Sequence, residues 1–122
     1  MSKKILLIED DPFLTDIYST KFKEAGFFLE TAEDGEQGLK KLNEKQFDFL
    51  VLDIVLPQID GWDVLKKIQS NKDLKDLKII VLSNLGQKEE VEKGLKFGAV
   101  KYLIKAHYTP SEVVAEIKKI PI

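Results

Sequence analysis

The chain has 122 residues, 43% of them hydrophobic and 33% charged, and this size and balance predict one soluble domain spanning residues 1–122. The formal net charge is −2 and all 19 basic residues are lysines, which excludes a general attraction to nucleic acid and the guanidinium fork that reads guanine. We therefore expect no direct binding of nucleic acid by this domain.

Five short apolar runs alternate along the chain with segments whose apolar residues recur at helical spacing. Asp11 directly before Pro12 predicts a helix start. Asp34, with Gln37 three residues later, resembles a capping box that opens a second helix. The predicted strands are 4–8, 27–31, 47–52, 79–82 and 100–104. The predicted helices run from Pro12 to Gly26, from Asp34 through Leu42, through Val64 to Ile68, from Gln87 to Phe97 and from Thr109 to Ile117.

This alternation of strands and helices predicts an α/β fold, because each helical crossover returns the chain in the same direction and leaves the sheet covered on both faces. We expect a single doubly wound (βα)5 domain with a five-stranded parallel sheet. In such sheets ligands bind beyond the carboxyl ends of the strands, and the flavodoxin-like order 2-1-3-4-5 places the first and third strands side by side there.

Polar side chains follow four of the five predicted strands. They are Glu9 and Asp10 after the first strand, Asp53 after the third, Ser83 after the fourth and Lys105 after the fifth. An aspartate at the end of one strand would by itself indicate only a turn. Three clustered carboxylates, however, repel one another unless a cation holds them ionised, and an all-oxygen site suits Mg²⁺. A metal, an ammonium and a hydroxyl around one carboxylate are what phosphoryl transfer needs, with Asp53 as the nucleophile that forms an aspartyl phosphate.

With these residues the chain resembles the response-regulator receiver family, the CheY-like phosphoacceptor modules of two-component signalling. The resemblance extends from Lys4 to the last helix, so that residues 1–122 would form one receiver domain. The positions that carry it are the acidic pair Glu9 and Asp10, the phosphorylated aspartate Asp53, the loop residues Pro57 and Gly61, the hydroxyl residue Ser83, the switch aromatic Tyr102 and the lysine Lys105.

The resemblance implies a metal site and a phosphoryl donor. Asp10 and Asp53 would bind Mg²⁺ directly, together with the backbone carbonyl of Val55, and Glu9 would act through a metal-bound water. The donor would be a phosphohistidine on a histidine kinase or a histidine phosphotransfer protein, with acetyl phosphate as a small substitute. The domain would catalyse its own phosphorylation and dephosphorylation without being a turnover enzyme.

The family switch would connect this site to an output surface. Ser83 and Lys105 would bind phosphoryl oxygens, and inward movement of the Ser83 hydroxyl would open space into which Tyr102 turns. We expect the output surface on the fourth helix, fifth strand and fifth helix, facing a partner protein that the sequence does not name. We expect a monomer or a weak, phosphorylation-dependent dimer. The lysines expected to be exposed on this surface are Lys88, Lys93, Lys96 and Lys101.

A few residues depart from the family pattern. Ala106 stands where proline usually follows the lysine, and a cis bond before a residue other than proline costs about 3 kcal/mol, so we expect a trans bond or a strained cis bond there. Asn84 stands where alanine is common, and we expect it to narrow access to the phosphoryl group and alter the dephosphorylation rate. Val100 and Lys101 replace acidic residues through which many DNA-binding relatives dimerise, so that dimer lacks support.

Three other functions compete with this interpretation. A flavin-binding module would need a phosphate site after the first strand, where Glu9 and its acidic neighbours repel phosphate. A Mg²⁺ phosphohydrolase would use Glu9 and Asp11 and leave Asp53 without a role. A receiver-like interaction module that is never phosphorylated is the main alternative, because site residues can persist without a donor.

The remaining composition bounds location and packing. No cysteine is present and His107 is the single histidine, which excludes thiolate and histidine-cluster metal sites. No apolar run reaches the roughly 20 residues that span a bilayer, and the start lacks a signal-peptide core, so we expect a cytoplasmic protein without membrane contact. Trp62 is expected to pack beside the active-site loop. The phenylalanines expected in core or helix–sheet packing are Phe13, Phe22, Phe27, Phe28 and Phe97.

Overall fold

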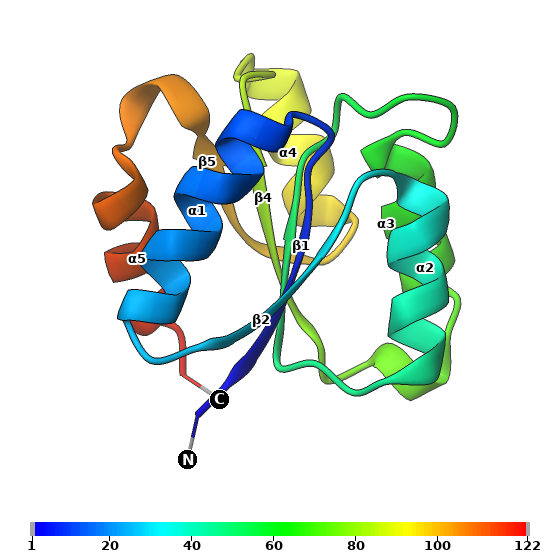
Figure 1. Cartoon of the computed structure of the whole chain (residues 1–122). Helices are drawn as coiled ribbons and strands as arrows, with labels where there is room; N and C mark the ends of the chain where they lie inside the picture. Colours follow the sequence, from blue (N-terminus) through cyan, green and yellow to red (C-terminus); the bar gives the residue numbers. More distant parts are fainter. Residues whose placement is uncertain (1, 122) are drawn as a thin grey trace.

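Over residues 2–121, which the computed structural model describes, five parallel strands form one sheet in the order β2-β1-β3-β4-β5 (Figure 1). This order confirms the predicted doubly wound α/β fold, and strand ends differ from the predicted ones by at most two residues. The strands are β1 (Lys4–Ile8), β2 (Phe28–Ala32), β3 (Phe49–Leu52), β4 (Lys78–Ser83) and β5 (Ala99–Ile104). The helices are α1 (Pro12–Glu24), α2 (Gly35–Glu44), α3 (Gly61–Gln69), α4 (Lys88–Lys96) and α5 (Pro110–Lys118), with short 3-10 turns η1 (Lys72–Leu74) and η2 (Lys105–His107).

Helices cover both faces of the sheet. Figure 1 shows α1 and α5 side by side on one face and α2 and α3 on the other. The helix α4 joins α3 through a contact between Trp62 and Phe97, whose ring centres lie 6.3 Å apart. No helix within residues 2–121 combines the length and apolar character needed to cross a bilayer.

The strand β1 illustrates why the sheet is buried on both sides. Leu6 and Ile8 pack with the side chains of α2 and α3, whereas Ile5 and Leu7 pack with those of α1 and α5. All four side chains are at most 1% exposed. Because successive residues of a strand point to opposite faces, a strand covered on both faces must be apolar throughout, as this run is.

Side-chain caps fix the helix starts. Asp11 caps α1, and its carboxylate accepts a hydrogen bond from the amide of Phe13 at 2.9 Å. Asp34 caps α2 in the same way through the amide of Gln37 at 2.8 Å. The predicted capping box at this helix forms in one direction only, because the Gln37 side chain accepts from the amide of Glu33 and not from that of Asp34.

The phenylalanines divide into two groups. Phe22 and Phe27 meet edge to face at 5.9 Å, and Phe27 meets Phe49 at 6.2 Å, so the prediction of core packing is confirmed for Phe22 and Phe27. It is wrong for Phe13 and Phe28, which are 70% and 63% exposed. Phe13 lies in the first turn of α1, beyond the end of the sheet, and Phe28 begins the edge strand β2, so neither lies between packed layers.

Candidate functional site

The carboxyl ends of the central strands bring the predicted polar residues to one edge of the sheet. Ile8 of β1 pairs with Leu52 of β3, so the residues that follow them, Glu9 and Asp53, leave the sheet side by side. The Asp53 amide donates to the Ile8 carbonyl at 3.2 Å, which extends the ladder to the acid itself. Glu9 and Asp53 are only 4% and 6% exposed, so both carboxylates lie in an environment where an unpaired charge is costly.

Three carboxylates meet at this edge. Glu9, Asp10 and Asp53 each offer an oxygen, and these oxygens lie within 4.8 Å of one another. Glu9 and Asp53 are buried, and Asp10 is exposed. An all-oxygen donor set with one face open to solvent fits a hard divalent cation such as Mg²⁺, which keeps several of its water ligands. The cluster could therefore hold a metal ion, and the three carboxylates predicted to form the metal site lie together.

Lys105 joins two of these carboxylates. Its Nζ lies 2.6 Å from Glu9 Oε2 and 2.6 Å from Asp53 Oδ2, and its side chain is 10% exposed. The three residues come from the ends of β1, β3 and β5, so the ammonium lies at the centre of a constellation assembled from distant parts of the chain. Buried ion pairs of this kind hold their partners in place because the loss of one partner leaves an uncompensated charge.

The electrostatics of this group favour the uptake of positive charge. Burial raises the pKa of the Glu9 carboxyl, and the neighbouring Lys105 only partly offsets it. Burial lowers the pKa of the Lys105 ammonium, but its hydrogen bonds and attraction to Asp53 and Glu9 together outweigh burial and raise the pKa above the usual lysine value. One ammonium shared between two buried carboxylates leaves excess negative charge, which a proton or a divalent cation can balance.

The loop after β3 supports the Asp53 side chain and leaves Val55 exposed. The amide of Val55 donates to Asp53 Oδ1 at 3.1 Å, and the amide of Gly61 donates to the Ile54 carbonyl at 2.8 Å. A Cβ atom on Gly61 would lie 2.5 Å from the Ile54 Cα, so only glycine lets the loop return this closely to the strand end. The predicted metal-binding role of the Val55 carbonyl stays a prediction.

Ser83 and Lys105 end neighbouring strands but use different partners. Ser83 is completely buried, and its hydroxyl accepts a hydrogen bond from the amide of Leu85 at 3.3 Å. The ammonium of Lys105 instead contacts the acidic cluster. The bond between Lys105 and Ala106 is trans, the first of the two states expected for it, like every other peptide bond that the structure describes.

The chain matches one known protein family over most of its length. Residues 5–118 match the model of the response regulator receiver domain. The chain belongs to the response regulator receiver family. It is therefore a receiver domain of the two-component systems, as its motifs predict.

The relatives of this receiver domain include transcriptional regulators. It is 35% identical to the alkaline phosphatase synthesis transcriptional regulatory protein PhoP of Bacillus subtilis, over 98% of this chain and 49% of that protein. It is 32% identical to the transcriptional regulatory protein CusR of Escherichia coli, over 94% of this chain and 49% of that protein. The chain thus spans about half the length of these curated relatives.

Solved structures share the whole architecture. The chemotaxis protein CheY4 of Vibrio cholerae superposes with a TM-score of 0.91 over 99% of this chain and all of that one, at 24% identity, which shows the fold. The BeF3-activated receiver domain of DrrB superposes with a TM-score of 0.85 at 29% identity, over 98% of this chain and 97% of that one. These matches agree with the strand order and the helix positions of this receiver domain.

Tyr102 of β5 lies inward against α4. Its hydroxyl donates to the backbone carbonyl of Leu85, in the loop that directly follows Ser83. Its ring packs on Gly94, where an added Cβ would lie 2.6 Å from the ring atom Cδ2. The predicted switch aromatic is therefore half-buried and bonded to the β4–α4 loop, and its role in switching stays a prediction.

The buried position of Tyr102 should appear in an alkaline titration. Burial, with smaller contributions from the charges of Glu90 and Asp53, raises its pKa from 10.0 to about 12. Because the folded-state pKa is the higher one, the stability that this group contributes is complete below pH 10 and is lost as the pH rises through about 12. Absorbance titration should show an ionisation step near pH 12 that is missing in Tyr102→Phe. A wild-type titration that is already complete before this step would contradict the expectation.

Gly94→Ala tests the packing of this ring. Alanine is the better helix residue by about 1 kcal/mol, but its methyl group would displace the ring. We expect a net loss of about 1–3 kcal/mol in urea unfolding and a fall of the Tyr102 pKa towards the ordinary tyrosine value. The same substitution in a Tyr102→Ala background should stabilise the protein, since the obstacle is gone. A stabilising Gly94→Ala in the wild-type background would show that the ring does not lie there.

The predicted output surface exposes three of the four lysines expected there. Lys88, Lys93 and Lys96 are exposed, but Lys101 is half-buried and forms an ion pair with Glu116 at 3.1 Å, so the prediction is wrong for it. Lys101 follows Val100 on β5, and successive residues of a strand point to opposite faces. The Lys101 side chain reaches the neighbouring α5, where its ammonium donates to Glu116.

Trp62 packs between two helices. The ammonium of Lys93 lies 4.3 Å from the centre of the Trp62 ring, in a cation–π contact between α4 and α3. Phe97, directly after α4, is half-buried and packs against the Trp62 ring. Trp62 is the single tryptophan of the chain, so its fluorescence reports on the position of α4.

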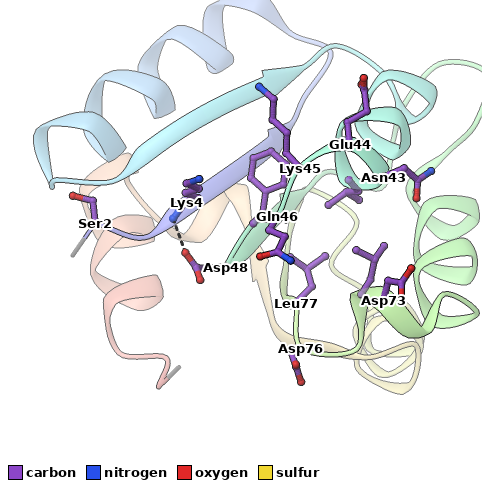
Figure 2. A pocket seen from close by; sticks show the side chains of 13 residues that line it. Ser2, Lys4, Asn43, Glu44, Lys45, Gln46, Asp48, Asp73, Asp76 and Leu77 are labelled. Atoms are coloured by element: carbon purple, nitrogen blue, oxygen red, sulfur yellow. Dashed lines mark hydrogen bonds between the residues drawn. The ribbon is translucent and has the colours of Figure 1, made fainter.

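A large hollow lies at the opposite edge of the sheet. It measures about 800 Å³ and is lined by residues at the amino ends of the strands, including Lys4, Asp48 and Leu77 (Figure 2). The Lys4 amide donates to Asp48 Oδ2 at 2.8 Å, which ties β1 to the start of β3. None of the predicted site residues is among those that line it. The predicted site residues therefore lie at the carboxyl edge of the sheet, away from this hollow.

Proposed function

We propose that this receiver domain is a phosphoacceptor, in which Asp53 accepts a phosphoryl group from a phosphohistidine on a histidine kinase or histidine phosphotransfer protein. The observation that carries the proposal is the constellation of Glu9, Asp10 and Asp53, with oxygens within 4.8 Å of one another and Lys105 bonded to two of them. Membership of the receiver family supports it.

Asp10 and Asp53, together with the Val55 carbonyl, would hold Mg²⁺, and Glu9 would hold one of its water ligands. The ion, when bound, would neutralise charge on the phosphoryl oxygens. The donor set supports this assignment because it is entirely oxygen, and the excess negative charge around Lys105 supports it electrostatically.

In the transfer step an oxygen of the Asp53 carboxylate attacks phosphorus. A P–O bond forms, the P–N bond to the donor histidine breaks, and the leaving imidazole nitrogen keeps the electron pair and takes a proton. In this structure the Lys105 ammonium occupies Asp53 Oδ2, so it must leave one carboxylate oxygen and pair with the incoming phosphoryl group. The two carboxylates keep the Lys105 ammonium charged and close to the oxygen that would attack phosphorus.

Ser83 would supply the second phosphoryl contact and start the switch. Its hydroxyl bonds to the Leu85 amide, so rotation towards the phosphoryl group releases that amide. The Leu85 carbonyl is the acceptor of the Tyr102 hydroxyl, so the same short loop connects the phosphoryl site to β5. The change would reach a partner protein through α4, β5 and α5, while the domain acts as a monomer or a weak, phosphorylation-dependent dimer. Each domain would be modified and restored, without turnover of a separate substrate.

Intact mass measurement tests this function. The protein is incubated with Mg²⁺ and acetyl phosphate, and a parallel sample contains EDTA in place of the metal. One added phosphoryl group that depends on Mg²⁺ is the expected result. No modification by acetyl phosphate or by any phosphohistidine donor would overturn the proposal and favour an interaction module that is never phosphorylated. Continuous release of phosphate from varied monoesters would favour a phosphohydrolase instead.

A further inference from the structure

Two of the departures from the family pattern, Asn84 and Ala106, contact each other. The side-chain oxygen Oδ1 of Asn84, in the loop after β4, accepts a hydrogen bond from the backbone amide of Ala106, in η2 after β5, at 3.1 Å. A proline at position 106 would have no N–H to donate, and an alanine at position 84 would have no oxygen to accept it. Each unusual residue therefore gives the other its partner.

We propose that Asn84 is a positioning residue that holds Lys105 in register with Ser83, an inference that rests on the proposed phosphoacceptor function. Asn84 directly follows Ser83, and Ala106 directly follows Lys105. The Asn84–Ala106 hydrogen bond thus connects the backbones of the two residues that would bind phosphoryl oxygens. The peptide bond between Lys105 and Ala106 is planar and trans, and its N–H is held by Asn84. Both features restrict the direction in which the Lys105 side chain leaves the backbone.

Two further contacts join the same segments. The Tyr102 hydroxyl bonds to the Leu85 carbonyl. Ile104 packs so closely on Gly86 that a Cβ there would lie 2.7 Å from the Ile104 Cδ1. Three successive residues of the β4–α4 loop, 84 to 86, therefore each contact β5 or the turn that follows it. The loop and the end of β5 form one unit, and the Asn84 contact lies at the end of that unit nearest the lysine.

The exposure of the pair sets the size of the effect. Asn84 and Ala106 are both exposed, so water competes for the hydrogen bond. One neutral hydrogen bond changes an equilibrium by about two- to twelvefold. Because transfer requires the Lys105 ammonium at the phosphoryl oxygens, loss of this bond should slow phosphorylation by acetyl phosphate by about the same factor.

Four variants separate positioning from simple obstruction of the site. Asn84→Leu keeps the bulk of the side chain and removes the acceptor, and Ala106→Pro removes the donor and leaves Asn84 untouched. We expect both to slow phosphorylation about two- to twelvefold, with no further loss in the double variant. Ala106→Ser keeps the N–H and should behave like the wild type. If Asn84 acted by bulk alone, Asn84→Leu would match the wild type, and that result would overturn the proposal.

Nuclear magnetic resonance of the unphosphorylated protein tests the contact without the reaction. The backbone amide at position 106 should be protected from hydrogen exchange in the wild type and in Ala106→Ser, and lose protection in Asn84→Leu. The side-chain ammonium signal of Lys105 should be sharp in the first two proteins and broadened in Asn84→Leu and Ala106→Pro. An Ala106 amide or a Lys105 signal that is unchanged in Asn84→Leu would overturn the positioning role. If the wild type shows the protected amide and the sharp Lys105 signal but no donor phosphorylates it, the proposed function would be overturned and the positioning role would stand.

Discussion

Asp53→Asn is expected to abolish phosphorylation by acetyl phosphate while leaving the fold intact. The amide has nearly the shape of the carboxylate but is neutral, so it neither attacks phosphorus nor binds a hard cation strongly. Lys105 keeps its contact with Glu9, which leaves the buried ammonium paired. Intact mass after incubation with Mg²⁺ should therefore show one added phosphoryl group on the wild type and none on the variant.

Asp48→Asn is the matched control for this experiment. Asp48 lies just before β3, at the other end of the same strand, and bonds to the Lys4 amide. The substitution changes the net charge equally but leaves the carboxyl edge of the sheet unaltered, so full phosphorylation is expected. A phosphoryl group found on Asp53→Asn would assign the acceptor to another residue. Loss of modification in both variants would point to a general effect of charge.

Lys105→Met should produce the largest loss of stability among the site variants. Methionine has similar length without the charge, so two carboxylates that are 3% and 7% exposed at their side chains lose their shared partner. Removing one member of a buried ion pair costs about 3–5 kcal/mol, because the remaining charge is left uncompensated. Urea unfolding at pH 7 without divalent cations should show a loss of this order. Phosphorylation should slow by about 10²- to 10³-fold, as for the loss of one donor to a developing charge.

Three comparisons test the physical cause of that loss. Glu9→Gln in the Lys105→Met background should restore part of the stability, since it removes one unpaired buried charge. Added Mg²⁺ should stabilise Lys105→Met, because an ion held at the proposed site would bind only the folded state and would replace the missing positive charge. The deficit should also shrink as the pH falls, because unpaired buried carboxylates have raised pKa values and take up protons in the folded state.

Lys101→Met provides a surface reference. Lys101 and Glu116 form an ion pair near the surface of β5 and α5, where solvent screens the charges. Its substitution should leave the free energy of unfolding nearly unchanged. A Lys105→Met variant as stable as Lys101→Met would mean that the two contacts of 2.6 Å contribute nothing to the fold.

Much of the fold follows from local sequence chemistry. The run from Ile5 to Ile8 is apolar at every position because both faces of its strand are covered, and Asp11 begins a helix because its carboxylate accepts a backbone amide. These are short-range properties, readable from spacing and residue type. Parallel strands then end at the same edge of the sheet, so the meeting of Glu9, Asp10 and Asp53 could also be predicted.

Packing between distant segments decided the rest. Phe13 and Phe28 are as apolar as Phe22, and their exposure depends on which layer covers each position. The capping pattern of Asp34 and Gln37 is a local signal, yet the Gln37 side chain bonds one residue earlier than the pattern predicts. Residue type limits the contacts that a side chain can make, and the residues packed around it determine which of those contacts form.

The sequence by itself determined the five strands, the edge at which chemistry gathers and the carboxylates that a cation would need, because these depend on periodicity and on the parallel winding of the chain. Only the tertiary structure decided that Lys105 bonds to both Glu9 and Asp53 and that Asn84 accepts from the Ala106 amide. These bonds join residues 96, 52 and 22 positions apart. Their geometry arises from strand register and loop packing, and no local pattern of residues specifies either.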